Sequence, residues 1–294
     1  MQEKIYNISY HNVLRSTKIY KKINYSNFAV KVKKIRNDKK LYDKYTFHEA
    51  FIDEGKKPIN LFFDFEINNI DKKDYSNKRN KMIGELNDFI HNVSLRCNWS
   101  NCKPSLLDGS REIKPGKYKL SFHLVFYGFC FLKTIHMKMY WDERKEAFRK
   151  MYPLLFEAVD LSVYKKPGSQ VKLRGIYSNK ENEPGTQLIP LSIKNTHNKD
   201  FEDGLTCSDK ESIKYYLIQY IGEYDRDILK MNAIDYERKE NSYTQKTNKG
   251  INYRNLKELK NKPPLKEIKR KIMERMRKID PEVAEFLRIP KDKN

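Results

Sequence analysis

The sequence of 294 residues has no apolar run long enough to cross a membrane. The longest run, residues 124–132, is less than half of the roughly 20 residues that a membrane-spanning helix needs. The first 22 residues lack a hydrophobic stretch followed by a small-residue cleavage site, so no secretory signal is predicted. Four cysteines are too few to predict a disulfide framework. We therefore expect an intracellular protein, in the cytoplasm, the nucleus or a viral replication site, that is not secreted and has no membrane partner.

Acidic residues are scarce relative to basic ones. The chain has 60 Lys and Arg against 39 Asp and Glu, which gives a formal net charge of +21. Such a charge predicts a polyanionic partner, nucleic acid first and an anionic membrane second. Hydrophobic residues make up 38% and aromatic residues 13%, which is enough for a folded interior and excludes disorder over the whole chain.

Helical and strand patterns alternate along the chain without internal repeats, which predicts an α+β fold. Strands are expected at residues 28–32, 59–67, 117–124, 171–177 and 187–193, and helices at 41–52, 77–97, 137–157 and 208–220. After about residue 235 the chain becomes more basic, with a polar linker at 242–253 and helical spacing at 265–279. We expect a core at residues 1–235 and a basic linker and helical tail at 236–294.

Two acids interrupt the apolar run at residues 59–67. Asp64 and Glu66 are two positions apart, and the period of a strand puts both carboxylates on one face. Two like charges so close favour a divalent cation between them, and carboxylate oxygens suit Mg²⁺ or Mn²⁺. Asp160, at the head of an expected strand, is the candidate for a third carboxylate. The alternative is that the pair is the solvent side of an edge strand.

A second polar row lies on the strand that begins at residue 117. Lys119, Ser121 and His123 are also spaced by two, and a cation, a hydroxyl and an imidazole in a row suit the oxygens of a triphosphate. The alternative for the histidine is a structural role with satisfied hydrogen bonds.

A third polar cluster follows Asp160 and contains Arg174, Ser178 and Lys180. It adds two cations and a hydroxyl to the candidate site. The alternative is a solvated basic loop.

The order of these clusters resembles the three motifs of the archaeo-eukaryotic primase superfamily, most closely its primase-polymerase branch. The similar stretches are LFFDFE at residues 61–66, KLSFH at 119–123, VDLSVY at 159–164 and RGIYSNK at 174–180. The resemblance covers about residues 25–225. It implies a catalytic core in which an N-terminal α/β unit and an RRM-like sheet form the active cleft.

The resemblance also implies roles for individual residues. The catalytic residues, which bind two divalent ions (Mg²⁺ or Mn²⁺), are Asp64, Glu66 and Asp160. The residues that hold the nucleotide triphosphate are Lys119, Ser121, His123, Arg174 and Lys180. The implied activity is that of a DNA-dependent primase-polymerase, which synthesises or extends primers on a single-stranded DNA template during replication. Its substrates are ribo- or deoxyribonucleoside triphosphates.

The sequence departs from better-known eukaryotic members of that superfamily. Cys97, Cys102 and His91 have no second ligand pair at suitable spacing, so zinc is not predicted, and starting strands without a primer is less strongly implied than extending them. A phosphate loop of the GxxxxGK[ST] type is also missing, so in replication either a helicase would act in trans or the chain is a fragment of a longer protein.

Other functions stay open at this point. One is a repair or lesion-bypass polymerase that requires a primer, and another is a non-catalytic nucleic-acid-binding primase subunit. A metal-dependent nuclease would also use acids and a lysine. The residues expected to hold a triphosphate disfavour the nuclease, which has no triphosphate to bind.

Overall fold

The structure of the chain is a computed structural model, and it describes residues 5–12, 17–38, 45–55, 57–96, 102–180, 183, 185–192, 213–219, 236 and 239–240. The chain divides into two compact units, Met1–Lys239 and Glu240–Asn294. All of the second unit except Glu240 lies outside the described residues. The division of the chain at residue 235 and the basic helical tail therefore stay predictions.

The first unit contains two antiparallel sheets and several helices, which confirms the predicted α+β class. The strands are β1 (Ile5–Asn12), β2 (Thr17–Asn24), β3 (Tyr45–Ile52), β4 (Ile59–Asp71), β5 (Lys103–Asp108), β6 (Arg111–Lys114), β7 (Lys117–Phe131), β8 (Gln170–Arg174) and β9 (Ile189–Leu191). The helices are α1 (Tyr25–Asn37), α3 (Lys72–Arg96), α4 (Thr134–Met151), α5 (Pro153–Ala158) and the short 3-10 helices η2 (Leu161–Val163) and η4 (Lys214–Tyr216).

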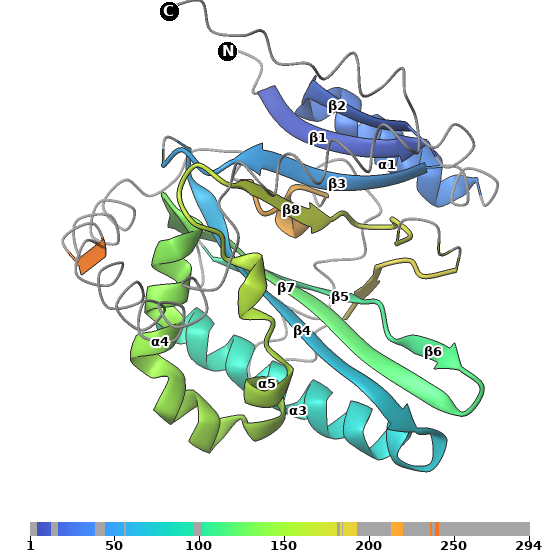
Figure 1. Cartoon of the computed structure of the whole chain (residues 1–294), viewed down its shortest axis with the longest axis vertical. Helices are drawn as coiled ribbons and strands as arrows, with labels where there is room; N and C mark the ends of the chain where they lie inside the picture. Colours follow the sequence, from blue (N-terminus) through green and yellow to red (C-terminus); the bar gives the residue numbers. More distant parts are fainter. Residues whose placement is uncertain are drawn as a thin grey trace, which may run out of the picture. The chain divides into compact units, whose positions relative to one another are not determined.

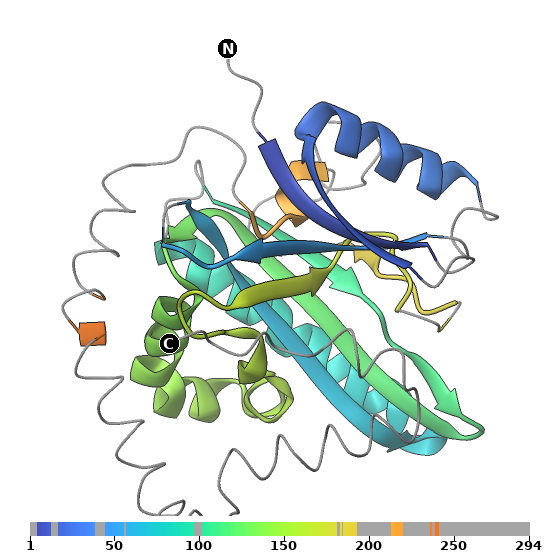
Figure 2. The same ribbon diagram turned by 45° about the horizontal axis from the view of Figure 1, so that its top comes forward.

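One sheet has the strand order β2-β1-β3-β8, and the other has the order β4-β7-β5-β9 with β6 paired to β7. Helices α3, α4 and α5 pack on one face of the five-stranded sheet (Figure 1). Strands β3 and β8 of the other sheet lie toward its opposite face (Figure 2). The five-stranded sheet is thus covered by helices on one face and has room for polar groups on the other.

Strand β4 alternates between these two faces, as its period requires. Phe63 and Phe65 are 1% or less exposed and point toward the helices, where Phe63 contacts Phe89 of α3 and Trp141 of α4. The residue between them, Asp64, points to the opposite face. The predicted strand at residues 59–67 is therefore confirmed and is longer than expected, as is the strand that begins at Lys117.

The prediction of a strand at residues 28–32 is wrong, because these residues lie in helix α1. The helix begins after Asn24, whose Oδ1 accepts a hydrogen bond from the backbone N–H of Asn27 at 2.9 Å. The side chains that it buries have helical rather than alternating spacing: Phe28, Val32 and Ile35 are buried, whereas Val30 is 52% exposed. These buried residues pack in a second core with Leu188 and Leu217, among others.

The prediction of a helix at residues 41–52 is also wrong, since residues 45–52 form β3 and residues 41–44 lie outside the described residues. Strand β3 pairs with β1 on one side and with β8 on the other. These hydrogen bonds come from segments far away in the sequence, so local apolar spacing does not reveal them.

The helix predicted at residues 137–157 is two helices, because Pro153 disfavours helical backbone at Tyr152, the residue before it. Strand β8 ends at Arg174 and β9 spans only Ile189–Leu191, so both are shorter than expected. In the helix predicted at 208–220, the described part, residues 213–219, has one 3-10 turn and then extended backbone at Leu217. The helix predicted at 77–97 is confirmed as α3 up to Arg96.

The segment 217–219 connects the two sheets. The buried carboxylate of Glu49 on β3 accepts hydrogen bonds from the backbone N–H groups of Ile218 and Gln219, at 2.8 and 2.9 Å. On the other side, Asn60 of β4 donates to the Leu217 carbonyl oxygen at 2.7 Å. Through these hydrogen bonds the segment 217–219 fixes the separation of β3 and β4. These two strands lie on either side of the polar face of the five-stranded sheet.

We expect Glu49→Gln to lower the free energy of unfolding by about 2–3 kcal/mol, because it weakens two charge-assisted hydrogen bonds in a buried place. Urea denaturation followed by circular dichroism measures the loss. The control is Glu157→Gln on α5, where the side chain is exposed and a change below about 0.5 kcal/mol is expected. An equal effect of both substitutions would contradict the structural role of Glu49.

Among the described residues, no helix has both the length and the apolar character needed to span a bilayer.

Candidate functional site

The two predicted polar rows face each other on paired strands. In the register of β4 and β7, Asp64 lies opposite His123 and Glu66 lies opposite Ser121. All four are on the face away from helices α3, α4 and α5, because the residues between them pack against those helices. The acids and the donors, more than fifty positions apart in the sequence, therefore form one surface.

The third acid reaches this surface from the free edge of β4. The backbone N–H of Asp160 donates to the carbonyl oxygen of Asp64 at 2.8 Å, and Val159 forms an isolated bridge with Phe65. The expected strand after Asp160 is absent: the residue instead caps the 3-10 helix Leu161–Val163, where its Oδ1 accepts from the N–H of Ser162 at 2.8 Å. The structure thus places Asp160 beside Asp64, but by an N-cap rather than at the head of a strand.

Asp64 is the most perturbed acid of the site. Its burial, followed by the charges of Glu66 and Asp160, raises its pKa to about 7, although Lys119 and Arg174 act in the opposite direction. Its Oδ1 is buried and has no hydrogen-bond partner in the part of the chain that the structure describes. A buried carboxylate oxygen that lacks a partner costs free energy, and a cation at this position would remove that cost.

Lys119 and Arg174 supply the positive charges next to the acids. Lys119 is 8% exposed, and its Nζ donates to Oε1 of Glu66. Arg174, at the end of β8, donates from Nη1 to the carbonyl oxygen of Thr186 at 2.7 Å. Burial and the neighbouring Arg111 lower the pKa of Arg174 to about 10, so the guanidinium is still charged at neutral pH. These cations make the surface suitable for a polyanion.

Ser121 and His123 provide neutral hydrogen-bonding groups. Nε2 of His123 lies 3.5 Å from Oδ1 of Asp64, which is within the distance of an ion pair. However, burial and the nearby charges of Arg174 and Lys119 hold the pKa of His123 well below 6.5, so the ring is uncharged at neutral pH. The Oγ of Ser121 is buried and has no hydrogen-bond partner among the described residues.

The third predicted cluster is brought to the site only in part. Lys180 is exposed, whereas Ser178 is fully buried. Between Arg174 and Ser178 the chain turns at Tyr177, whose φ of 57° is in the left-handed region that non-glycine residues rarely adopt. Thr186 connects the two cations, because its Oγ1 accepts from the N–H of Lys180 at 2.7 Å and its carbonyl oxygen accepts from Arg174.

Two positions beside the candidate site escaped the sequence analysis. Arg111 of β6 pairs with Lys119 of β7, so it extends the row of cations across a third strand. Gly109 leaves room for the site, because a Cβ there would lie 3.1 Å from Nη2 of Arg174 and 3.6 Å from Oγ of Ser121. The only local signal is the Asp-Gly turn followed by alternating residues at 111–114.

An open pocket of about 550 Å³ lies at the Lys119 end of this surface. Its described lining includes three cations, Arg111, Lys119 and Lys180, from three separate segments of the chain. Glu112 and Glu183 also line it. A cavity of this size with converging basic groups suits a phosphate-bearing ligand.

The described residues contain no group of three or more His, Cys, Asp or Glu side chains that is already arranged around a metal position. The reason is visible in their contacts: Glu66 turns to Lys119, and Asp160 caps the helix that follows it. The residues nevertheless fit a divalent cation, because in the described part of the chain a buried oxygen of Asp64 accepts no hydrogen bond, and two further carboxylates are close enough to raise the pKa of Asp64.

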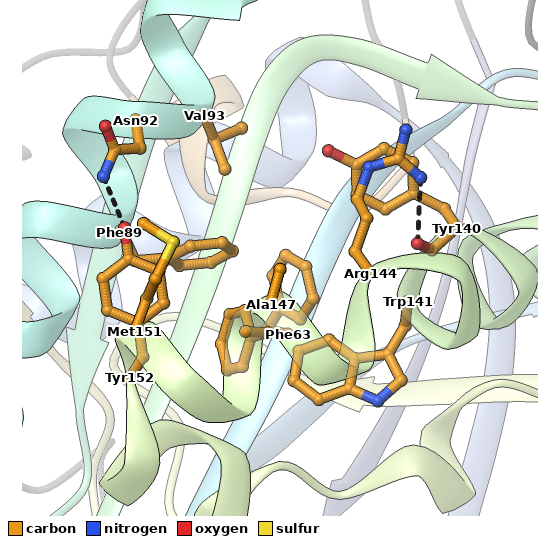
Figure 3. Close-up of a pocket in the computed structure, with 11 residues that line it drawn as sticks. Phe63, Phe89, Asn92, Val93, Tyr140, Trp141, Arg144, Ala147, Met151 and Tyr152 are labelled. Atoms are coloured by element: carbon orange, nitrogen blue, oxygen red, sulfur yellow. Dashed lines mark hydrogen bonds between the residues drawn. The ribbon is translucent and has the colours of Figure 1, made fainter.

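A second cavity, of about 80 Å³, lies on the helix side of the sheet between α3 and α4 (Figure 3). Its described lining is mainly aromatic and includes Phe63, Phe89 and Trp141. The charged residue in this lining, Arg144, stacks on the ring of Tyr140 at 3.9 Å. This cavity is a gap in the apolar packing and holds no set of groups suited to catalysis.

In comparisons with known proteins, no family model matches the chain and no curated protein is significantly similar to it.

Proposed function

We propose that the protein is a metal-dependent nucleotidyltransferase of the primase-polymerase kind, acting on single-stranded DNA. The observation that carries this proposal is the pairing of two polar rows on adjacent strands. On β4, Asp64 has a buried oxygen without a hydrogen-bond partner among the described residues, and Glu66 follows on the same face. On β7, the opposing residues are a lysine, a serine and a neutral histidine, which are groups that bind phosphate oxygens.

The acids and the cations have separate roles in this proposal. Asp64, Glu66 and Asp160 would hold divalent ions, Mg²⁺ or Mn²⁺, which when bound neutralise phosphate charge and favour the ionised form of an attacking hydroxyl. The residues proposed to bind the triphosphate are Lys119, Ser121, His123, Arg174, Lys180 and Arg111. In the reaction, the 3′-hydroxyl of the growing strand attacks the α-phosphate, a new phosphodiester bond forms and pyrophosphate leaves.

The arrangement of the sheets is compatible with the primase-type core. In this proposal the sheet that contains β4, β7 and β5 is the RRM-like element, and the sheet that contains β3 and β8 belongs to the N-terminal unit. Asp64 then belongs to the first of these sheets and Arg174 to the second, and each residue perturbs the pKa of the other. The net charge of +21 favours binding of the template backbone, with an affinity that falls steeply with salt.

Incorporation of labelled nucleotides tests the proposal. The purified chain is incubated with nucleoside triphosphates and Mg²⁺ or Mn²⁺ on single-stranded DNA, with and without a primer. We expect template-dependent products that disappear in EDTA. Product only on the primed template would favour the repair or lesion-bypass polymerase over the primase. DNA binding without any product would contradict the enzyme and favour the non-catalytic subunit.

A further inference from the structure

The open pocket lined by Arg111, Lys119 and Lys180 is called the basic pocket below. The carboxylate of Glu183 forms ion pairs with two of these three cations. Oε2 of Glu183 lies 3.0 Å from Nη2 of Arg111, and its Oε1 lies 2.8 Å from Nζ of Lys180. The bond to Lys180, and then the one to Arg111, lowers the pKa of Glu183, so the side chain is ionised at neutral pH. The third cation, Lys119, is matched by Glu66. The two oxygens of Glu183 thus bind its two cations as two oxygens of a phosphate group would.

The position of Glu183 is fixed by its backbone and not by its carboxylate. The carbonyl oxygen of Glu183 accepts from Oγ1 of Thr186 at 2.6 Å, and the N–H of Thr186 donates to Oδ1 of Asn179 at 2.9 Å. The side chain itself is 43% exposed. It can therefore leave the cations by rotating, while the turn that carries it stays folded.

The ion pairs of Glu183 are weak enough to be replaced. The side chains of Lys180 and Glu183 are 55% and 43% exposed, so water screens their ion pair, whereas Arg111 is 15% exposed and its pair is partly buried. A triphosphate carries more negative charge than one carboxylate, and its oxygens are well suited to a guanidinium. The ligand must still displace the carboxylate of Glu183. Because the two cations are free to bind the ligand in only a fraction of the molecules, the apparent affinity for the ligand is lower than the intrinsic affinity by that fraction.

We infer that Glu183 is a built-in competitor of the nucleotide, an anion that holds Arg111 and Lys180 until a phosphate group displaces it. This inference rests on the proposed function, and it adds a residue that sets the phosphate requirement of the pocket. A ligand with several phosphates replaces both contacts of the carboxylate and gains further ones at Lys119. A ligand with a single phosphate replaces them at best one for one.

Binding of inorganic tripolyphosphate, measured by titration calorimetry in the absence of DNA, tests the inference with the full chain. We expect Glu183→Gln to bind tripolyphosphate about tenfold more tightly than the native protein, a difference of about 1.4 kcal/mol, since the competing carboxylate charge is removed. Arg111→Gln should bind it more weakly than the native protein. The relative gain of Glu183→Gln should be about the same for inorganic phosphate, because the competing carboxylate lowers the apparent affinity of every ligand of these cations by the same fraction.

The matched control is Glu112→Gln. Glu112 lines the same pocket, but its carboxylate accepts a hydrogen bond from the N–H of Gly116 at 2.7 Å in the turn between β6 and β7. Equal gains for both variants would show a general charge effect and overturn the inference, as would unchanged or weaker binding by Glu183→Gln. Binding of tripolyphosphate does not depend on turnover. Tighter binding by Glu183→Gln in a protein that incorporates no nucleotide would therefore refute the proposed function and retain the competitor.

Discussion

The substitution Asp64→Asn is expected to reduce nucleotide incorporation about a thousandfold or more while the protein stays folded and still binds single-stranded DNA. The amide has the shape of the carboxylate, but it carries no charge to hold a divalent cation. Glu66 and Asp160 do not replace it, because in this proposal each of them already contributes its own carboxylate to the ions. Single-turnover incorporation on a primed template measures the rate, and fluorescence anisotropy measures the binding of DNA.

Strand β4 offers a matched control for this substitution. Asp71 lies at the end of the same strand, is exposed and pairs with Lys117 at 2.7 Å. Asp71→Asn should leave the rate within about twofold of the native value, because surface ion pairs of this kind contribute little. An Asp64→Asn variant that retains a tenth of the native rate would contradict the role proposed for Asp64.

The substitution Asp64→Asn should also make the metal-free protein more stable than the native protein at alkaline pH. In the folded protein the Asp64 carboxyl keeps its proton up to about pH 7, whereas in the unfolded chain it loses the proton near pH 3.8. Between these values the unfolded state releases the proton and the folded state does not, so the free energy of unfolding falls as the pH rises. The cost reaches at most about 4 kcal/mol above pH 7. Asparagine has no such cost.

Thermal unfolding in EDTA over pH 4–8 measures this difference. We expect the advantage of Asp64→Asn over the native protein to grow from pH 4 to pH 7 and to level off above that. Mg²⁺ or Mn²⁺ should raise the melting temperature of the native protein at pH 8 and leave that of the variant unchanged, because only the native site binds the ion. Parallel pH profiles for the two proteins would show that the burial of Asp64 has no energetic cost.

The sequence alone was sufficient to predict the two strands that carry the candidate site, β4 and β7, and their polar faces. Alternation around Asp64 and Ser121 is strict, and each strand has aromatic residues on the buried face, so the period of two was unambiguous. The same rule failed at α1, where Phe28, Val30 and Val32 alternate by coincidence. There the Asn24 cap and the buried Ile35 are the features that distinguish a helix.

The parts of the site that could not be predicted depend on pairing between distant segments. Arg111 becomes a site residue only because β6 pairs with β7, and Glu183 only because its turn folds back on Lys180 and Arg111. The place of Asp160 depends on one backbone hydrogen bond to Asp64, ninety-six positions earlier in the chain. Local patterns contain no information about such contacts, whereas the motif order did bring Asp160 and Arg174 into consideration.

The segment that carries Asp160 also has a protective effect on the molecule. Strand β4 is an edge strand of its sheet, and its run of apolar residues would be a template for strand pairing with another chain if its edge were open. The outward carbonyl oxygens of Phe62 and Asp64 are instead bonded to the Tyr164 hydroxyl and to the N–H of Asp160. The segment 160–164, which supplies the third acid, therefore also covers the edge of β4. Substitutions that break its hydrogen bonds to β4 should lower the solubility of the protein as well as its activity.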